Sequence, residues 1–99
     1  MGTKADRRRK LEKQTVMFLR RRYKLFPEVS SLTATNAAQT AALDAWNAWV
    51  ASVWAELTLR LDEVDAAADE ATWDAVRIDR ETLRTADPNL KIRQFLRLT

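Results

Sequence analysis

The 99-residue chain has no cysteine, no histidine and one glycine, Gly2. Without them it lacks thiol and imidazole chemistry, a nucleophile–histidine triad and a Gly-rich phosphate loop, so we expect no enzyme, cofactor or metal site. The net charge of +3 hides three blocks: ten basic against two acidic residues in 1–24, one against nine in 25–76, and six against three in 77–99. This asymmetry points to charged partners rather than to a reaction.

Helix-breaking residues are rare, because the only prolines are Pro27 and Pro88. Few breaks mean few and long elements. We therefore expect an all-α fold of three or four helices in a single domain, with a basic N-terminal helical arm at 1–26 and a helical body at 27–99. One long central helix is compatible with the pattern, which leaves open whether residues 36–86 form one helix or two.

The first expected helix spans roughly residues 4–26. Its main apolar stripe has helical spacing and consists of Val16, Leu19, Tyr23 and Phe26. An adjacent row contains Leu11, Phe18 and Leu25. The basic cluster near the start opposes the helix macrodipole, so we expect residues 1–10 to fray in the absence of a partner.

The second expected helix has the strongest pattern. Asn36 is a predicted N-cap with Gln39 at the capping-box spacing. The apolar residues then recur every three or four positions: Leu43, Trp46, Val50, Val53, Leu57, Leu61 and Val64. The opposite face carries small residues seven apart, at Ala41, Ala48 and Ala55, which would let another helix approach closely.

Towards the C-terminus the pattern weakens. We expect a bend near 66–71, a third helix at about 71–86, and a short helix started by Asp87 as N-cap and Pro88 as its first residue. The last ten residues fit a helix or a strand equally well.

The basic arm is the main functional candidate, because Lys and Arg at this density neutralise phosphates. The candidate polyanion-binding residues are Arg7, Arg8, Arg9, Lys10, Lys13, Arg20, Arg21, Arg22 and Lys24. Phe18 and Tyr23 among them are candidates for base stacking. Other readings are a solvated helix face, contact with an acidic protein segment of the same or another copy, and a membrane surface, for which Met17, Phe18 and Leu19 beside three arginines are suited.

The tryptophans suggest a protein interface. Three of the four lie within nine residues of the central helix. Trp is common in hydrophobic cores and enriched at interfaces, and a short chain has difficulty enclosing three large rings. We therefore predict a self-association surface made of Trp46, Trp49, Val50, Val53, Trp54 and Leu57.

The remaining features exclude more than they indicate. The acidic residues 62–70 lack the spacing of a calcium loop, so we expect a solvated face or a docking surface for a basic partner. No apolar run resembles a signal peptide or a membrane span, so we expect a cytoplasmic protein or one within a virion or other large assembly.

These observations predict a non-catalytic structural or assembly protein. In this hypothesis it forms homo-oligomers through its Trp-rich central helix and contacts nucleic acid with its basic arm, in the general layout of coat, connector and packaging proteins. The alternative is a small helical adaptor or inhibitor that binds one protein target without nucleic acid.

Overall fold

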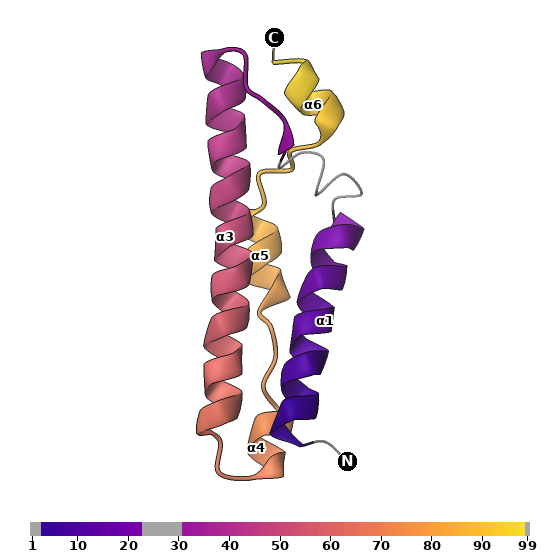
Figure 1. The fold of residues 1–99 in the computed structure, drawn as a ribbon, viewed down its shortest axis with the longest axis vertical. Coiled ribbons are helices and arrows are strands. Elements are labelled where there is room, and N and C mark those ends of the chain that lie inside the picture. The colour runs from indigo at the N-terminus through magenta and orange to yellow at the C-terminus, as the bar shows by residue number, and fades with distance from the viewer. Residues whose placement is uncertain (1–2, 23–30, 99) are drawn as a thin grey trace.

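A computed structural model of the chain describes residues 3–22 and 31–98. The described residues form a rod of helices without strands. The helices are α1 (Lys4–Arg22), α3 (Ala37–Ala66), α4 (Glu70–Asp74), α5 (Arg80–Ala86) and α6 (Ile92–Leu96). The rod measures 53 × 19 × 18 Å, and its long axis follows α3, with the other helices on one side of it (Figure 1). The predicted all-α class and the long central helix are confirmed.

Helix α1 begins at a reciprocal cap. The backbone N–H of Thr3 donates to the Asp6 carboxylate over 3.2 Å, and the N–H of Asp6 donates to the Thr3 hydroxyl over 3.1 Å. This cap satisfies donors that would otherwise be orphaned, and Asp6 also offsets the basic cluster in the first turn. The predicted fraying of residues 1–10 is therefore wrong from Lys4 onwards. Tyr23, Phe26 and the predicted domain division after residue 26 lie outside the described residues.

Helix α3 begins where the sequence predicts. The side chain of Asn36 accepts a hydrogen bond from the backbone N–H of Gln39 over 2.8 Å, as an N-cap does. The buried Gln39 side chain reaches back to the N–H and hydroxyl of Thr35. The helix runs for 30 residues and ends at Ala66, inside the predicted bend region.

The predicted helix at 71–86 is wrong as a single element, because residues 76–79 between α4 and α5 are not helical. Each short helix starts at an aspartate whose side chain accepts from the N–H and the hydroxyl of a threonine three residues later. The pairs are Asp69 with Thr72, and Asp79 with Thr82. A local cap of this kind competes with helix continuation, so the chain restarts twice without glycine or proline.

The segment after α5 also departs from the prediction. Asp87 does not start a helix: its side chain accepts from the backbone N–H of Asn89 over 2.6 Å, in an Asx turn around Pro88. Asn89 has a positive φ of 56°, which asparagine tolerates better than most residues. The ambiguity of the last ten residues resolves into the short helix α6, which begins at Ile92.

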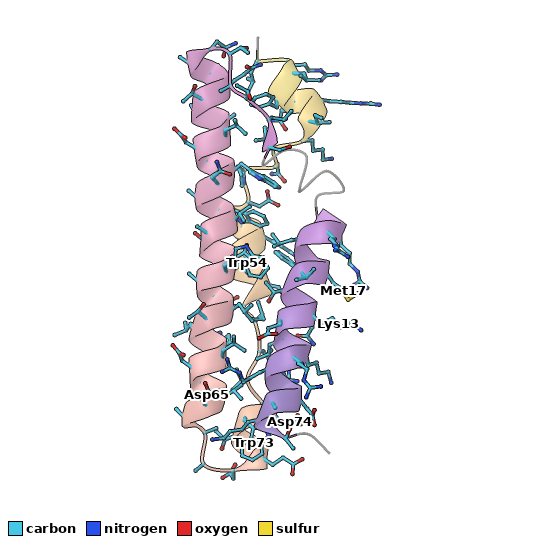
Figure 2. All side chains as sticks on the ribbon, viewed as in Figure 1. Lys13, Met17, Trp54, Asp65, Trp73 and Asp74 are labelled. Atoms are coloured by element: carbon cyan, nitrogen blue, oxygen red, sulfur yellow. The ribbon has the colours of Figure 1, made fainter. Side chains whose placement is uncertain are left out.

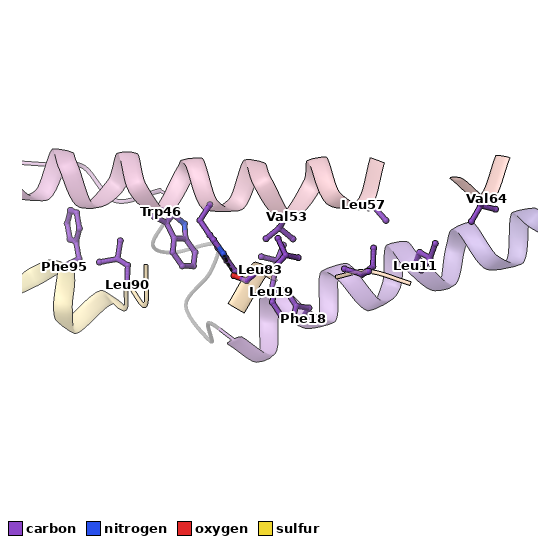
Figure 3. Close-up of a cluster of buried hydrophobic side chains, with 12 residues drawn as sticks. Leu11, Phe18, Leu19, Trp46, Val53, Leu57, Val64, Leu83, Leu90 and Phe95 are labelled. Carbon is purple, nitrogen blue, oxygen red and sulfur yellow. Dashed lines mark hydrogen bonds between the residues drawn. The ribbon is translucent and has the colours of Figure 1, made fainter. Parts of the chain in front are cut away.

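The core is one continuous row of side chains along α3 (Figure 3). At one end Leu90 and Phe95 pack beside Trp46, and at the other end Leu11 lies near Val64. The buried apolar residues are Leu11, Phe18, Leu19, Trp46, Trp49, Val53, Leu57, Val64, Ala67, Ile78, Leu83, Leu90 and Phe95. Helix α1 thus shares one core with the rest of the chain.

Candidate nucleic-acid interface

The rotation of α1 about its axis decides which of its cations are free. Leu11, Phe18 and Leu19 are buried against the rest of the molecule, while Val16 is only half-buried. The face made by Leu11, Phe18 and Leu19 therefore packs on the core, and Val16 of the predicted main stripe lies at its edge. At 100° per residue this choice turns one set of basic side chains inward and another outward.

The inward set consists of Lys4, Arg7 and Arg8, which hold α1 on the acidic end of α3 and on α4. Arg8 forms an ion pair with Asp65 at 2.5 Å. Lys4 donates to the backbone carbonyl of Asp65 over 2.9 Å, and its ammonium lies 5.5 Å from the centre of the Trp73 ring. Arg7 and Arg8, two of the predicted polyanion ligands, are therefore engaged within the chain.

Arg7 is the most buried cation among the described residues, with 5% of its surface exposed. Its guanidinium donates to the backbone carbonyl of Val76, and its Nε has no hydrogen-bond partner. Burial, reinforced by the nearby charge of Arg77, lowers the pKa of Arg7 below its ordinary value, while Asp74 acts in the opposite direction. Arg7 thus bridges α1 to the segment after α4 at a desolvation cost.

The outward set consists of Arg9, Lys10, Lys13, Arg20 and Arg21, all exposed. At 100° per residue they share an arc of about 120° on the side of α1 away from the core. Figure 2 shows Lys13 on this outer side, beside Met17. Asp6 approaches Arg9 at 3.6 Å, in a pair that is open to solvent. The side chain of Arg22, and Lys24, lie outside the described part of the structure.

A cleft of about 360 Å³ opens between α1 and α5 beside this outward set. Three arginines take part in its wall, together with one glutamine and two apolar residues. The lining residues are Gln14, Met17, Phe18, Arg21, Arg80 and Arg84. Within residues 3–22 and 31–98, no carboxylate forms an ion pair with Arg21, Arg80 or Arg84. Among the described residues, the cleft therefore gathers three arginines without a paired carboxylate.

Two hydrogen bonds from α3 hold α5, and with it two of the cleft arginines. The indole N–H of Trp49 donates to the Leu83 carbonyl over 2.7 Å, and the N–H of Asp79 donates to the Glu56 carboxylate over 2.9 Å. Glu56 is itself paired with Arg60, an arrangement that raises the pKa of Arg60, first through Glu56 and then through Glu63. The α5 wall of the cleft is thus fixed to the central helix at two points.

The predicted tryptophan interface lies mostly inside the chain. Trp46, Trp49, Val53 and Leu57 are buried, and Val50 is half-buried. Of the six residues only Trp54 is exposed, at 39%. Phe18, a predicted stacking residue, lies with its ring centre 6.0 Å from that of Trp49 and is 8% exposed, so it offers no free face to a base.

The outer face of α3 is exposed and nearly free of charge over its first six turns. Its small residues repeat with the alternating spacing of four and three that brings helices together in coiled coils. They are Ala41, Ala45, Ala48, Ser52 and Ala55, and the larger Leu59 follows at the same spacing, all exposed. Leu59 exposes 51% of its surface. This face lies on the side of α3 away from the buried stripe of Trp46, Val53 and Leu57.

Sequence reasoning missed Arg80 and Arg84 as site residues. A local signal was present: Asp79 and Thr82 have the spacing of an N-cap, which starts a helix at Arg80 and places Arg84 one turn further on the same face. The position of that face against Phe18 and Arg21 depends on tertiary packing and had no local signal.

The described residues were also compared with the requirements of a metal site and of a membrane span, and the chain with known proteins. Among residues 3–22 and 31–98, no group of three or more acidic side chains is placed to hold a metal ion. No helix in the same ranges is long and apolar enough to cross a membrane. Comparison of the chain with protein-family models, with curated proteins and with solved structures finds no match.

Proposed function

We propose that this chain is a non-catalytic assembly protein that contacts nucleic acid through the outer face of α1 and associates with copies of itself through the outer face of α3. One observation carries the proposal: the rod has two unlike faces on opposite sides. The outer face of α1 carries basic residues with little compensating charge, and the outer face of α3 carries mostly small side chains and little charge.

The nucleic-acid side rests on the outward set of α1. Five cations on one arc of a 19-residue helix suit a polyanion as partner better than they suit a single carboxylate, because regularly spaced phosphates can engage all five together. The set contains no exposed aromatic ring, so the proposed contact reads the phosphate backbone and not the bases.

The self-association side replaces the predicted tryptophan interface with the opposite face of α3. Small side chains at alternating spacings of four and three allow close approach of a second helix, and exposed Leu59 adds apolar surface. The adaptor alternative uses the same surface for a different protein.

Salt-dependent binding to random-sequence duplex DNA tests the nucleic-acid side. If the five outward cations contact phosphates, the slope of log affinity against log salt is about −4 to −5, at about −0.9 for each contact. Replacing Arg9, Lys13 and Arg20 by Ala flattens the slope by about one unit per lost contact. The matched control removes three charges at the far end of the rod, with Lys91, Arg93 and Arg97 replaced by Ala. Equal effects of the two triple variants contradict an interface on α1, and absence of binding favours the adaptor.

Light scattering at tens of micromolar tests self-association. We expect a mass above that of one chain, and a return to the monomer mass in Ala48→Glu, which places a charge in the middle of the small-residue face. Gln94→Glu adds the same charge on α6 and leaves the mass unchanged. A wild-type chain that is monomeric under these conditions contradicts this half of the proposal.

A further inference from the structure

We propose that the cleft between α1 and α5 is a phosphate-binding site, in which Arg21, Arg80 and Arg84 hold one phosphodiester group of a nucleic-acid strand. The proposal rests on the function proposed above and deepens it, because it adds two residues from the C-terminal half of the chain to the contact surface. It begins from the cleft of about 360 Å³ and the residues that line it.

The first step is electrostatic. Three arginines line one small cleft, and no described carboxylate pairs with any of them. Like charges gathered beside the apolar side chains of Met17 and Phe18 repel one another more strongly than in open water. An anion in the cleft removes this repulsion, so the chain gains stability by binding one.

The second step is preorganisation. The Arg84 guanidinium lies 5.9 Å from the centre of the Phe18 ring, in a cation–π contact that restricts its orientation. Phe18 packs against Trp49, whose indole N–H also bonds the carbonyl of Leu83, the residue before Arg84. Both walls of the cleft are therefore held by the same tryptophan, and little ordering remains when a ligand binds.

The third step concerns the class of ligand. Guanidinium groups donate in a planar fork that matches two oxygens of a phosphate, and the Gln14 amide adds a further donor. A base has no place in the site, because Arg84 lies over the nearly buried Phe18 ring. The cleft thus selects a phosphate group without regard to sequence.

The fourth step identifies a strand, and not a free anion, as the source of that phosphate. Lys10, Gln14, Met17 and Arg21 follow one another at spacings of four, three and four, so they form a single row along α1. This row joins the cleft to the outward set. A phosphodiester seated in the cleft can therefore continue as a backbone over Lys10 and Lys13, which a single phosphate ion cannot do.

The test compares Arg80→Gln/Arg84→Gln with Arg93→Gln/Arg97→Gln, which loses the same charge on α6 and at its C-cap. Gln keeps the helix propensity and an aliphatic stem over Phe18, and thermal unfolding verifies that each variant folds. With a random-sequence single-stranded DNA 12-mer, we expect the cleft variant to bind roughly tenfold or more weakly. Its salt slope flattens by about 1.4 units, at about 0.7 for each lost contact. The control variant stays close to wild type.

A second measurement uses the wild-type chain and needs no variant. In the wild-type chain, the Nε–Hε NMR signals of Arg80 and Arg84 shift on addition of the 12-mer, while that of Arg93 does not. Unchanged Arg80 and Arg84 signals, or equal weakening by the cleft and control variants, overturn the cleft site. The broader function survives that result if replacement of Arg9, Lys13 and Arg20 still weakens binding.

Two further outcomes separate the sources of phosphate. If inorganic phosphate shifts the Arg80 and Arg84 signals at concentrations as low as the 12-mer does, the site takes a free anion and the strand assignment is overturned. If the wild-type chain binds neither 12-mer nor duplex DNA, the proposed function fails, and this inference fails with it.

Discussion

The inward and outward sides of α1 both carry Arg and Lys, but the inward residues are engaged within the chain and the outward ones are exposed. Arg7 and Arg8 face inward. Arg7 is buried and donates to the backbone carbonyl of Val76, and Arg8 pairs with Asp65. Arg9 and Lys10, their immediate neighbours, face solvent. Since the four residues are consecutive, composition and charge density cannot tell them apart. The difference teaches that the rotational phase of a helix, set by its apolar packing, decides which cations are available to a partner.

The largest expected effect tests that phase directly. Leu11→Ala removes a fully buried side chain and lowers the free energy of unfolding by about 2–5 kcal/mol. Val16→Ala removes a half-buried side chain of the predicted main stripe and costs less than about 1.5 kcal/mol. Urea unfolding followed by circular dichroism measures both. The reverse order would place the predicted stripe in the core and turn α1 about its axis, which changes the set of cations that face outward.

The second prediction compares neighbouring arginines. Arg7→Ala removes one of the two donors to the Val76 carbonyl, the other being Arg77, and it removes the packed stem, so we expect a loss of about 1–3 kcal/mol in the free energy of unfolding. Arg9→Ala removes an exposed side chain and changes the free energy of unfolding by no more than about 0.5 kcal/mol. Similar losses in the two variants would mean that the two sides of α1 are not distinct.

A smaller effect is expected for the ion pair between Arg8 and Asp65. Both side chains are partly exposed, at 36% and 54%, so a double-mutant cycle to Ala gives a coupling of about 0.2–1 kcal/mol. The coupling shrinks in high salt because screening weakens exposed pairs. A coupling that is absent at low salt would show that apolar packing alone docks α1.

The smallest effect concerns acid stability and the position of α5. The hydroxyl and N–H of Thr82, followed by Arg60, lower the pKa of Asp79 below its ordinary value. A carboxylate whose pKa is lower in the folded than in the unfolded chain stabilises the fold above the unfolded pKa, near 4. That stability is lost as the pH falls through the folded value.

Thr72 lowers the pKa of Asp69 in the same way, so thermal stability should decline below about pH 4. Asp79→Asn keeps a capping side chain and makes this decline shallower. Thr82→Ala raises the pKa of Asp79, as read by carboxyl NMR. An Asp79 pKa at or above its ordinary value would contradict the cap that starts α5.

Several local features were readable from the sequence. Asn36 and Gln39 predicted the start of α3 because an N-cap needs only residues three apart in the chain. The caps at Thr3, Asp69 and Asp79 have comparable signals and were overlooked, which explains why α1 starts without fraying and why the third helix is divided. Short-range hydrogen bonds of this kind do not depend on the rest of the fold.

The sequence by itself determined the helical class, the long α3 with its apolar stripe, and the separation of basic and acidic segments. Only the tertiary structure decided which apolar row of α1 faces α3, because two adjacent rows fit the same period. It also decided that Trp46 and Trp49 lie in the core rather than at an interface, and that Arg80 and Arg84 stand opposite Arg21. Periodicity records the angle of a residue about its own helix, whereas a cleft depends on how two helices pack against a third.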